Sequence, residues 1–259
     1  MPLIKYILLF LILLNISAYS KPLEIIIAYQ NTDNYPFQTQ NSQETNWKKP
    51  GVLLEMFKIV EKKMNIKIHF KRYPWKRALF EMKHGKIHGV FSASYKTKRL
   101  EFGRYPRNGK EVDESRRTHY NSYSLYKKSS SNISWNGKTL KNITKKICAE
   151  RAYSIVDDLK KMGFDVYEVS YTSKCIELLY NNRVDAFAAL ELAGDALLKE
   201  NKYQNIVKVK PALRTKAYYL MLSHQFVKKH PKLSEEVWDT IQIVRDSKEM
   251  ESIYKKYFK

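Results

Sequence analysis

The sequence has few of the residues that build several specialised classes of protein. Only two of its 259 residues are cysteine, too few for a disulfide-rich scaffold or a four-cysteine zinc site. Eight glycines and eight prolines exclude collagen-like and glycine-rich low-complexity chains. With 44% hydrophobic and 13% aromatic residues, the chain is a poor candidate for disorder and can build one large domain or two smaller lobes.

Long apolar runs are also missing, except for one near the N-terminus. Residues 6–16 are nearly all apolar, and they follow a single positive charge at Lys5. Ala18 and Ser20 then occupy the small-residue positions that precede a cleavage site. The run is about half of the roughly 20 residues that a membrane-spanning helix needs. The pattern predicts a signal peptide over residues 1–20, cleaved after Ser20, and hence a periplasmic or secreted protein.

Acidic residues are outnumbered, with 26 acidic against 47 basic side chains and a formal net charge of +21. Such an excess can indicate a nucleic-acid or anionic-membrane partner. Here the lysines are scattered through the sequence and do not form one stripe. We therefore predict a solvated, lysine-rich surface and no nucleic-acid partner.

The sequence also lacks the signatures of common enzyme classes. It has no G-x-S-x-G element, and the Ser-x-x-Lys match at residues 124–127 has no companion segments. The six histidines show no His-Glu-x-x-His spacing. We predict no catalytic residue, no metal site and no cofactor.

Export gives the two cysteines a role. Cys148 and Cys175 lie 27 positions apart and would meet an oxidising compartment, where disulfides persist. We predict a disulfide between them, the alternative being two buried thiols that never meet.

Short apolar segments alternate with amphipathic ones along the rest of the sequence. Residues 23–28 predict a buried strand, and a helix opens after Gly51 with apolar residues at helical spacing. Further strands are expected at 66–70, 87–91, 146–149, 165–169 and 184–188, and further helices at 75–83, 154–162, 173–180 and 192–200. A long amphipathic helix is expected around Trp238. This order predicts an α/β fold whose strands form mostly parallel sheets, two of them.

One stretch carries binding chemistry. The strand expected at 87–91 continues into Ser92 and Ser94, whose hydroxyls an extended chain turns to the same side. Arg99 is the arginine of a Thr-x-Arg turn, five residues past Ser94, that begins the next helix. Hydroxyls beside a guanidinium fork suit a carboxylate, and a helix N-terminus adds a favourable dipole.

Several weak motifs occur in a specific order. Tyr35-Pro36-Phe37 follows the first strand, and Glu55 lies four residues after Gly51. Residues 182–186 read Asn-Arg-Val-Asp-Ala, and residues 254–258 read Tyr-Lys-Lys-Tyr-Phe. Together they resemble the family 3 extracellular solute-binding proteins, the periplasmic receptors of polar amino-acid transport. The resemblance covers essentially the whole mature chain and implies a two-lobe, type II periplasmic-binding-protein-like α/β fold with a ligand cleft between the lobes.

The resemblance also implies roles for single residues. Arg99 matches the arginine that grips a ligand carboxylate, with Ser94 as its hydroxyl partner. Tyr35 falls where an aromatic ring covers the ligand and Trp75 forms a second wall, although both could simply pack. The complete set of ligand-binding residues expected from the resemblance is Tyr35, Trp75, Ser92, Ser94, Arg99, Arg151, Tyr153, Ser154 and Glu191.

The second lobe departs from the family pattern. Amino-acid receptors of this family usually carry an Asp shortly after the Arg-Val-Asp-Ala element to hold the ligand ammonium. Here Leu190 falls at that position, with Glu191 next to it as a substitute. An amino acid as the ligand therefore stays open.

The implied lobes are discontinuous in sequence. Lobe one is expected at residues 21–120 and 216–259 and lobe two at residues 121–215, with crossings near 119–126 and 212–219. We expect a monomer that captures a small anionic or zwitterionic ligand for uptake, closing by a hinge motion that a membrane permease partner can read. Two alternatives are an exported dehydratase-like enzyme, for which no general acid is evident, and a sensor for a signalling receptor.

Overall fold

The computed structural model describes residues 22–39 and 44–258. The expected signal peptide lies outside the described residues. Within them, no helix combines the length and the hydropathy of a membrane span.

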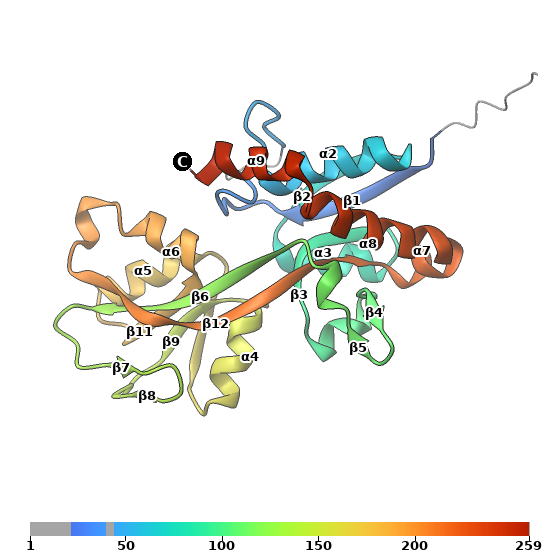
Figure 1. The fold of residues 1–259 in the computed structure, drawn as a ribbon. Coiled ribbons are helices and arrows are strands. Elements are labelled where there is room, and N and C mark those ends of the chain that lie inside the picture. The colour runs from blue at the N-terminus through green and yellow to red at the C-terminus, as the bar shows by residue number, and fades with distance from the viewer. Residues whose placement is uncertain (1–21, 40–43, 259) are drawn as a thin grey trace, which may run out of the picture.

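Lobe one contains three parallel strands, β1 (Glu24–Gln30), β2 (Lys67–Tyr73) and β3 (Gly89–Ser94). Side chains alternate between the two faces of these strands. Ile25 and Ile27 pack beneath α2 (Val52–Met64), α8 (Pro231–Arg245) and α9 (Lys248–Phe258), whereas Ala28 packs against α3 (Trp75–Lys83). The short helix α7 (His224–Lys229) precedes α8. Figure 1 shows these helices around the upper right part of the molecule.

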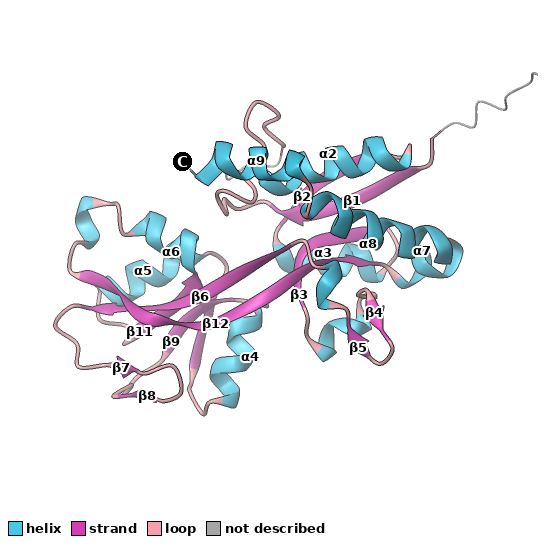
Figure 2. Cartoon of the chain, viewed as in Figure 1, coloured by secondary structure: helices cyan, strands magenta, loops and turns pink. Residues whose placement is uncertain are grey.

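Lobe two repeats the plan with β9 (Ile147–Glu150), β10 (Val166–Val169) and β11 (Ala186–Leu190), which are also parallel. The helix α4 (Ser154–Lys161) covers one face. The helices α5 (Thr172–Tyr180) and α6 (Glu191–Leu197) lie on the other (Figure 2). The predicted disulfide is confirmed: it joins Cys148 of β9 to Cys175 of α5, with 5.4 Å between their Cα atoms.

Two long strands connect the lobes. β6 (His119–Lys128) and β12 (Ile206–Leu222) pair antiparallel and run side by side from one lobe into the other. They complete a single eight-stranded sheet of order β10-β9-β11-β6-β12-β3-β1-β2. The expectation of two mostly parallel sheets is therefore wrong, because the crossings are themselves strands that pair with β11 and β3.

The pairing of the two crossing strands is irregular within lobe two. The pairing of β12 with β6 shifts register between Val209 and Arg214, and this stretch contains Pro211, which has no N–H to donate. The remaining strands are short hairpins, β4 (Arg107–Asn108) with β5 (Glu111–Val112) and β7 (Ser134–Trp135) with β8 (Leu140–Lys141). The part of the chain that the structure describes also contains the 3₁₀ turns η1 (Thr97–Glu101), η2 (Glu114–Arg116) and η3 (Asn201–Tyr203).

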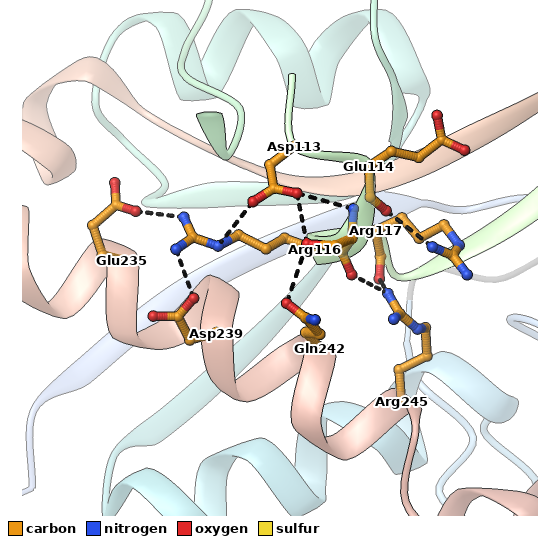
Figure 3. A network of polar contacts seen from close by, with 9 residues as sticks. Asp113, Glu114, Arg116, Arg117, Glu235, Asp239, Gln242 and Arg245 are labelled. Carbon is orange, nitrogen blue, oxygen red and sulfur yellow. Dashed lines mark hydrogen bonds and ion pairs between the residues drawn. The ribbon is translucent and has the colours of Figure 1, made fainter. Parts of the chain in front are cut away.

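A polar network fixes the start of β6 to α8 (Figure 3). Arg116 of η2 pairs with Glu235 at 2.6 Å and with Asp239 at 2.7 Å. Arg245 of α8 donates to the backbone oxygens of Ser115 and Arg117. The crossing strand therefore leaves lobe one from a fixed position.

Candidate functional site

Two adjoining cavities lie where the carboxyl ends of β1 and β3 face those of β9 and β11. This edge is where ligands bind in open α/β sheets. The smaller cavity, about 30 Å³, is lined by Arg99, Ser94 and Trp75 among others. The larger, about 580 Å³, is lined by Asp33, Glu150 and Tyr171 among others. Asn34, Tyr153 and Leu190 line both, so the two cavities form neighbouring compartments of one inter-lobe cleft.

Arg99 is at the centre of the smaller compartment. Its side chain is buried, and Nη1 donates to the backbone oxygen of Ser94 at 2.7 Å and to Ser94 Oγ at 3.0 Å. Nη2 donates to the backbone oxygen of Ala152 in lobe two at 3.0 Å. The guanidinium lies 5.1 Å from the Trp75 ring centre. No ion pair links Arg99 to a carboxylate of the described chain.

The two serines reach this compartment by different backbone geometries. Ser94 is in regular pairing with Tyr218 of β12, whereas Ser92 has a φ of 59° beside a register shift in that pairing. Both still line the smaller cavity. The expected helix after them is the five-residue turn η1, too short to contribute the predicted helix dipole, so that expectation is corrected.

The aromatic residues differ in position. Trp75 is buried at the start of α3 and lines the smaller cavity, where its Nε1 finds no partner among the described residues. Tyr35 lines the larger cavity, but its hydroxyl donates to the backbone oxygen of Tyr257 and Lys49 lies over its ring. Tyr35 thus contacts the C-terminal helix while forming part of the cavity wall.

The loop after β9 brings only one of its expected residues to the cleft. Tyr153 lines both cavities and donates from its hydroxyl to Gln30 Oε1 at 2.6 Å. Ser154 is buried at the start of α4, outside both linings. Arg151 is exposed and also lies outside both linings.

Glu191 does not take the missing ammonium position in this structure. It begins α6 outside both linings, where it accepts from Lys208 at 2.8 Å and from Ser124 at 3.1 Å. Leu190, one residue earlier, is buried and lines both compartments. The acceptor that the family pattern leads one to expect is therefore replaced here by an apolar side chain.

Glu150 is the residue that the sequence analysis missed. It ends β9 and is only 6% exposed, yet it lines the larger cavity. Its Oε1 accepts from Gln30 of lobe one at 2.7 Å, and its Oε2 accepts from Thr172 at 2.8 Å. Burial raises the pKa of Glu150 to about 7. The available signal was an acidic residue that closes an otherwise apolar strand, Ile-Cys-Ala-Glu, at the edge of the sheet where ligands bind.

The lobes contact each other directly around this cleft. Besides the bonds of Arg99 and Gln30, Lys96 beyond β3 forms an ion pair with Asp157 of α4 at 2.6 Å. The smaller cavity has room for only one or two waters. The lobes are therefore in direct contact around the smaller cavity.

Unpartnered polar atoms gather at the smaller compartment. Among the side-chain atoms described, Asn34 Oδ1, Gln38 Oε1, Ser92 Oγ and the Tyr218 hydroxyl are buried without a hydrogen-bond partner. All four residues line this cavity. Buried polar groups are ordinarily paired, so this concentration is typical of a site that takes a polar ligand or water. No cluster of His, Cys, Asp or Glu suited to a metal ion occurs within residues 22–39 and 44–258.

Comparison with known proteins places this arrangement in a class. The model for bacterial extracellular solute-binding proteins, family 3, matches residues 25–259. The chain therefore belongs to this family, and its two-lobe α/β structure has the type II periplasmic-binding-protein-like fold. No curated protein matches the sequence.

Solved structures share the fold at low sequence identity. An ancestral arginine-binding protein bound to arginine is 17% identical with a TM-score of 0.71, covering 92% of this chain and 100% of that one. A histidine kinase sensor domain similar to periplasmic binding proteins is 15% identical with a TM-score of 0.71, covering 92% and 96%. An ancestral amino acid-binding protein, a precursor of cyclohexadienyl dehydratase, is 13% identical with a TM-score of 0.66, covering 91% and 95%.

Proposed function

We propose that this protein is an exported receptor that captures a small carboxylate-bearing ligand between its lobes for uptake. Lobe one comprises residues 21–120 and 216–259, and lobe two comprises residues 121–215. The ligand carboxylate meets Arg99 and Ser94, while Trp75, Ser92 and Tyr153 complete the walls. A membrane permease is the partner that receives the ligand.

The position of Arg99 carries the proposal. It is a buried cation with no carboxylate partner in the described chain, and it lies beside several unpaired polar atoms. Buried charges are ordinarily paired because an unpaired one costs several kcal/mol. A planar carboxylate offers the guanidinium two parallel hydrogen bonds and supplies the missing countercharge.

Hinge motion gives the ligand access. Opening must break the Arg99–Ala152 and Gln30–Glu150 hydrogen bonds together with the Lys96–Asp157 ion pair. A ligand that bridges the lobes replaces these contacts and shifts the population toward the closed form. The hinge lies where β6 and β12 pass between the lobes, at residues 119–122 and 215–218.

Calorimetry tests the proposal once a thermal-shift screen of the twenty L-amino acids has found a ligand. Arg99→Ala should weaken binding at least about tenfold, because a hydrogen bond to a charged group contributes about 1.5–3 kcal/mol and tenfold is about 1.4 kcal/mol. Arg99→Lys should restore only part of the affinity, since an ammonium lacks the fork. Arg77→Ala is the matched control, because Arg77 lies exposed on α3 beside Glu81. Unchanged affinity in Arg99→Ala would contradict the proposal.

A dehydratase-like enzyme is the second candidate, and one observation favours it. Glu150 is a buried carboxyl in the cleft whose pKa is raised to about 7, which suits a general acid near neutral pH. Incubation with arogenate or prephenate separates the two functions. Turnover that Glu150→Gln abolishes would establish the enzyme, and no turnover by a protein that binds amino acids would establish the receptor.

A further inference from the structure

The larger compartment of the cleft has a charge opposite to that of the protein. The chain has 47 basic side chains, yet the described residues that line this compartment include no Lys, Arg or His. Two carboxylates, Asp33 and Glu150, do line it. Lys49 lies over the ring of Tyr35 at this wall but is not among the residues that line the 580 Å³ space.

The groups that donate to Glu150 are neutral. Its oxygens accept side-chain hydrogen bonds from Gln30 and from Thr172, and the Thr172 backbone and the Tyr153 side chain also favour its ionised form. The nearby titratable groups from adjoining elements are Tyr153 and Tyr123, whose pKa values are raised and which are therefore neutral. Among the described residues no cation forms an ion pair with Glu150, and burial raises its pKa to about 7.

The unpaired atoms around Glu150 are also acceptors. Asn34 Oδ1 is buried without a partner among the described residues, in a side chain that is 8% exposed and lines both compartments. Asn31 Oδ1, in the larger compartment, is likewise unpartnered in the described part of the chain. Tyr171 offers an exposed ring at the same wall, which suits a cation. These acceptors suit a ligand rich in N–H donors.

From this we infer that the ligand is an amino acid with a cationic side chain, whose terminal ammonium or guanidinium group is held by Glu150. The inference rests on the proposed function, in which the carboxylate of the same ligand meets Arg99. Arg99 lines only the smaller compartment and Glu150 only the larger, so a molecule must extend from one into the other to meet both. Asn34 lies at the junction, where its free oxygen can accept from the α-ammonium group, because Leu190 there cannot.

A pair of ligands that differ only in the charge of one end tests this directly. L-arginine and L-citrulline have the same length, but citrulline carries a neutral ureido group. Calorimetry would compare both ligands with the wild type, with Glu150→Gln and with Glu168→Gln. Glu168 is the matched control because it lies on neighbouring β10 outside the cavity linings, paired with Lys160. The Gln variant at position 150 keeps an acceptor for Gln30, and the hydroxyl of Thr172 can turn to accept from its amide.

The wild type and Glu168→Gln should bind arginine at least about tenfold more tightly than citrulline. In Glu150→Gln this preference should fall to about threefold or less, while a circular dichroism spectrum and a thermal unfolding curve like those of the wild type show that the variant is folded. Equal binding of both ligands by the wild type, or a preference that survives in Glu150→Gln, would overturn the inference and leave the carboxylate receptor intact. If the wild type bound neither arginine nor citrulline, the inference of a cationic amino-acid ligand would also be overturned. The proposed receptor function would then be tested separately, by whether Arg99→Ala fails to bind the amino acid found in the thermal-shift screen.

Discussion

Removing the disulfide should destabilise lobe two by a predictable amount. Cys148 and Cys175 are both fully buried, and their bond closes a loop across 27 positions. In the chain-entropy model, closing such a loop removes about 3–4 kcal/mol of unfolded-chain freedom at 25 °C. Cys148→Ala/Cys175→Ala should therefore lower the free energy of unfolding by about this amount, with a further loss from the missing sulfur atoms in the core.

Urea denaturation of the exported protein with and without dithiothreitol measures the effect. The wild type should unfold at lower urea when reduced, whereas the double variant should not respond to the reductant and so serves as the control. A reductant effect below about 1 kcal/mol would refute the chain-entropy reasoning for this loop. Two free thiols in the unreduced protein, detected by mass spectrometry, would refute the bond itself.

Two further predictions concern pH and lobe closure. Burial lowers the pKa of His119 to about 3, so the unfolded chain gains a proton below its usual pKa of about 6.5 while the folded protein does not. The free energy of unfolding should accordingly fall by up to about 1.4 kcal/mol per pH unit as the pH drops from about 6.5 toward 3. Thermal unfolding measured across this pH range should show that His119→Phe removes the contribution of His119 to this slope. An unchanged slope would contradict the lowered pKa of His119. Lys96→Met should remove the inter-lobe ion pair with Asp157, which contributes at most about 1 kcal/mol. Small-angle scattering of the ligand-free protein should then show a larger radius of gyration. Lys138→Met, at an exposed position, is the control, and an equal rise in that variant would show a general effect of charge instead.

Local sequence patterns predicted much of the fold because they depend on local physics. The helix expected at 75–83 coincides with α3, since its apolar positions repeat at helical spacing and Pro74 precedes it. The single sheet was not predictable in the same way. β6 and β12 pair across about 90 positions of sequence, and strand pairing at that distance leaves no periodic signal in either segment.

The site was predictable where one short segment carries it. Ser92, Ser94 and Arg99 share a strand and the turn after it, so their proximity follows from the sequence. Glu150 was missed because its importance depends on its contact with Gln30, which lies 120 positions away in the other lobe. For Glu191 the sequence suggested a role that the structure does not support. Glu191 lies next to the expected ammonium-binding position in sequence, but the sequence could not show that its carboxylate forms an ion pair with Lys208.

Native mass spectrometry of the exported protein, purified without denaturation, tests the central claim most directly. The wild type should retain a small molecule that contains a carboxylate, and Arg99→Ala should lose it while Arg77→Ala keeps it. Retention of the same molecule by Arg99→Ala would contradict the account, because the carboxylate would then be held somewhere other than at Arg99.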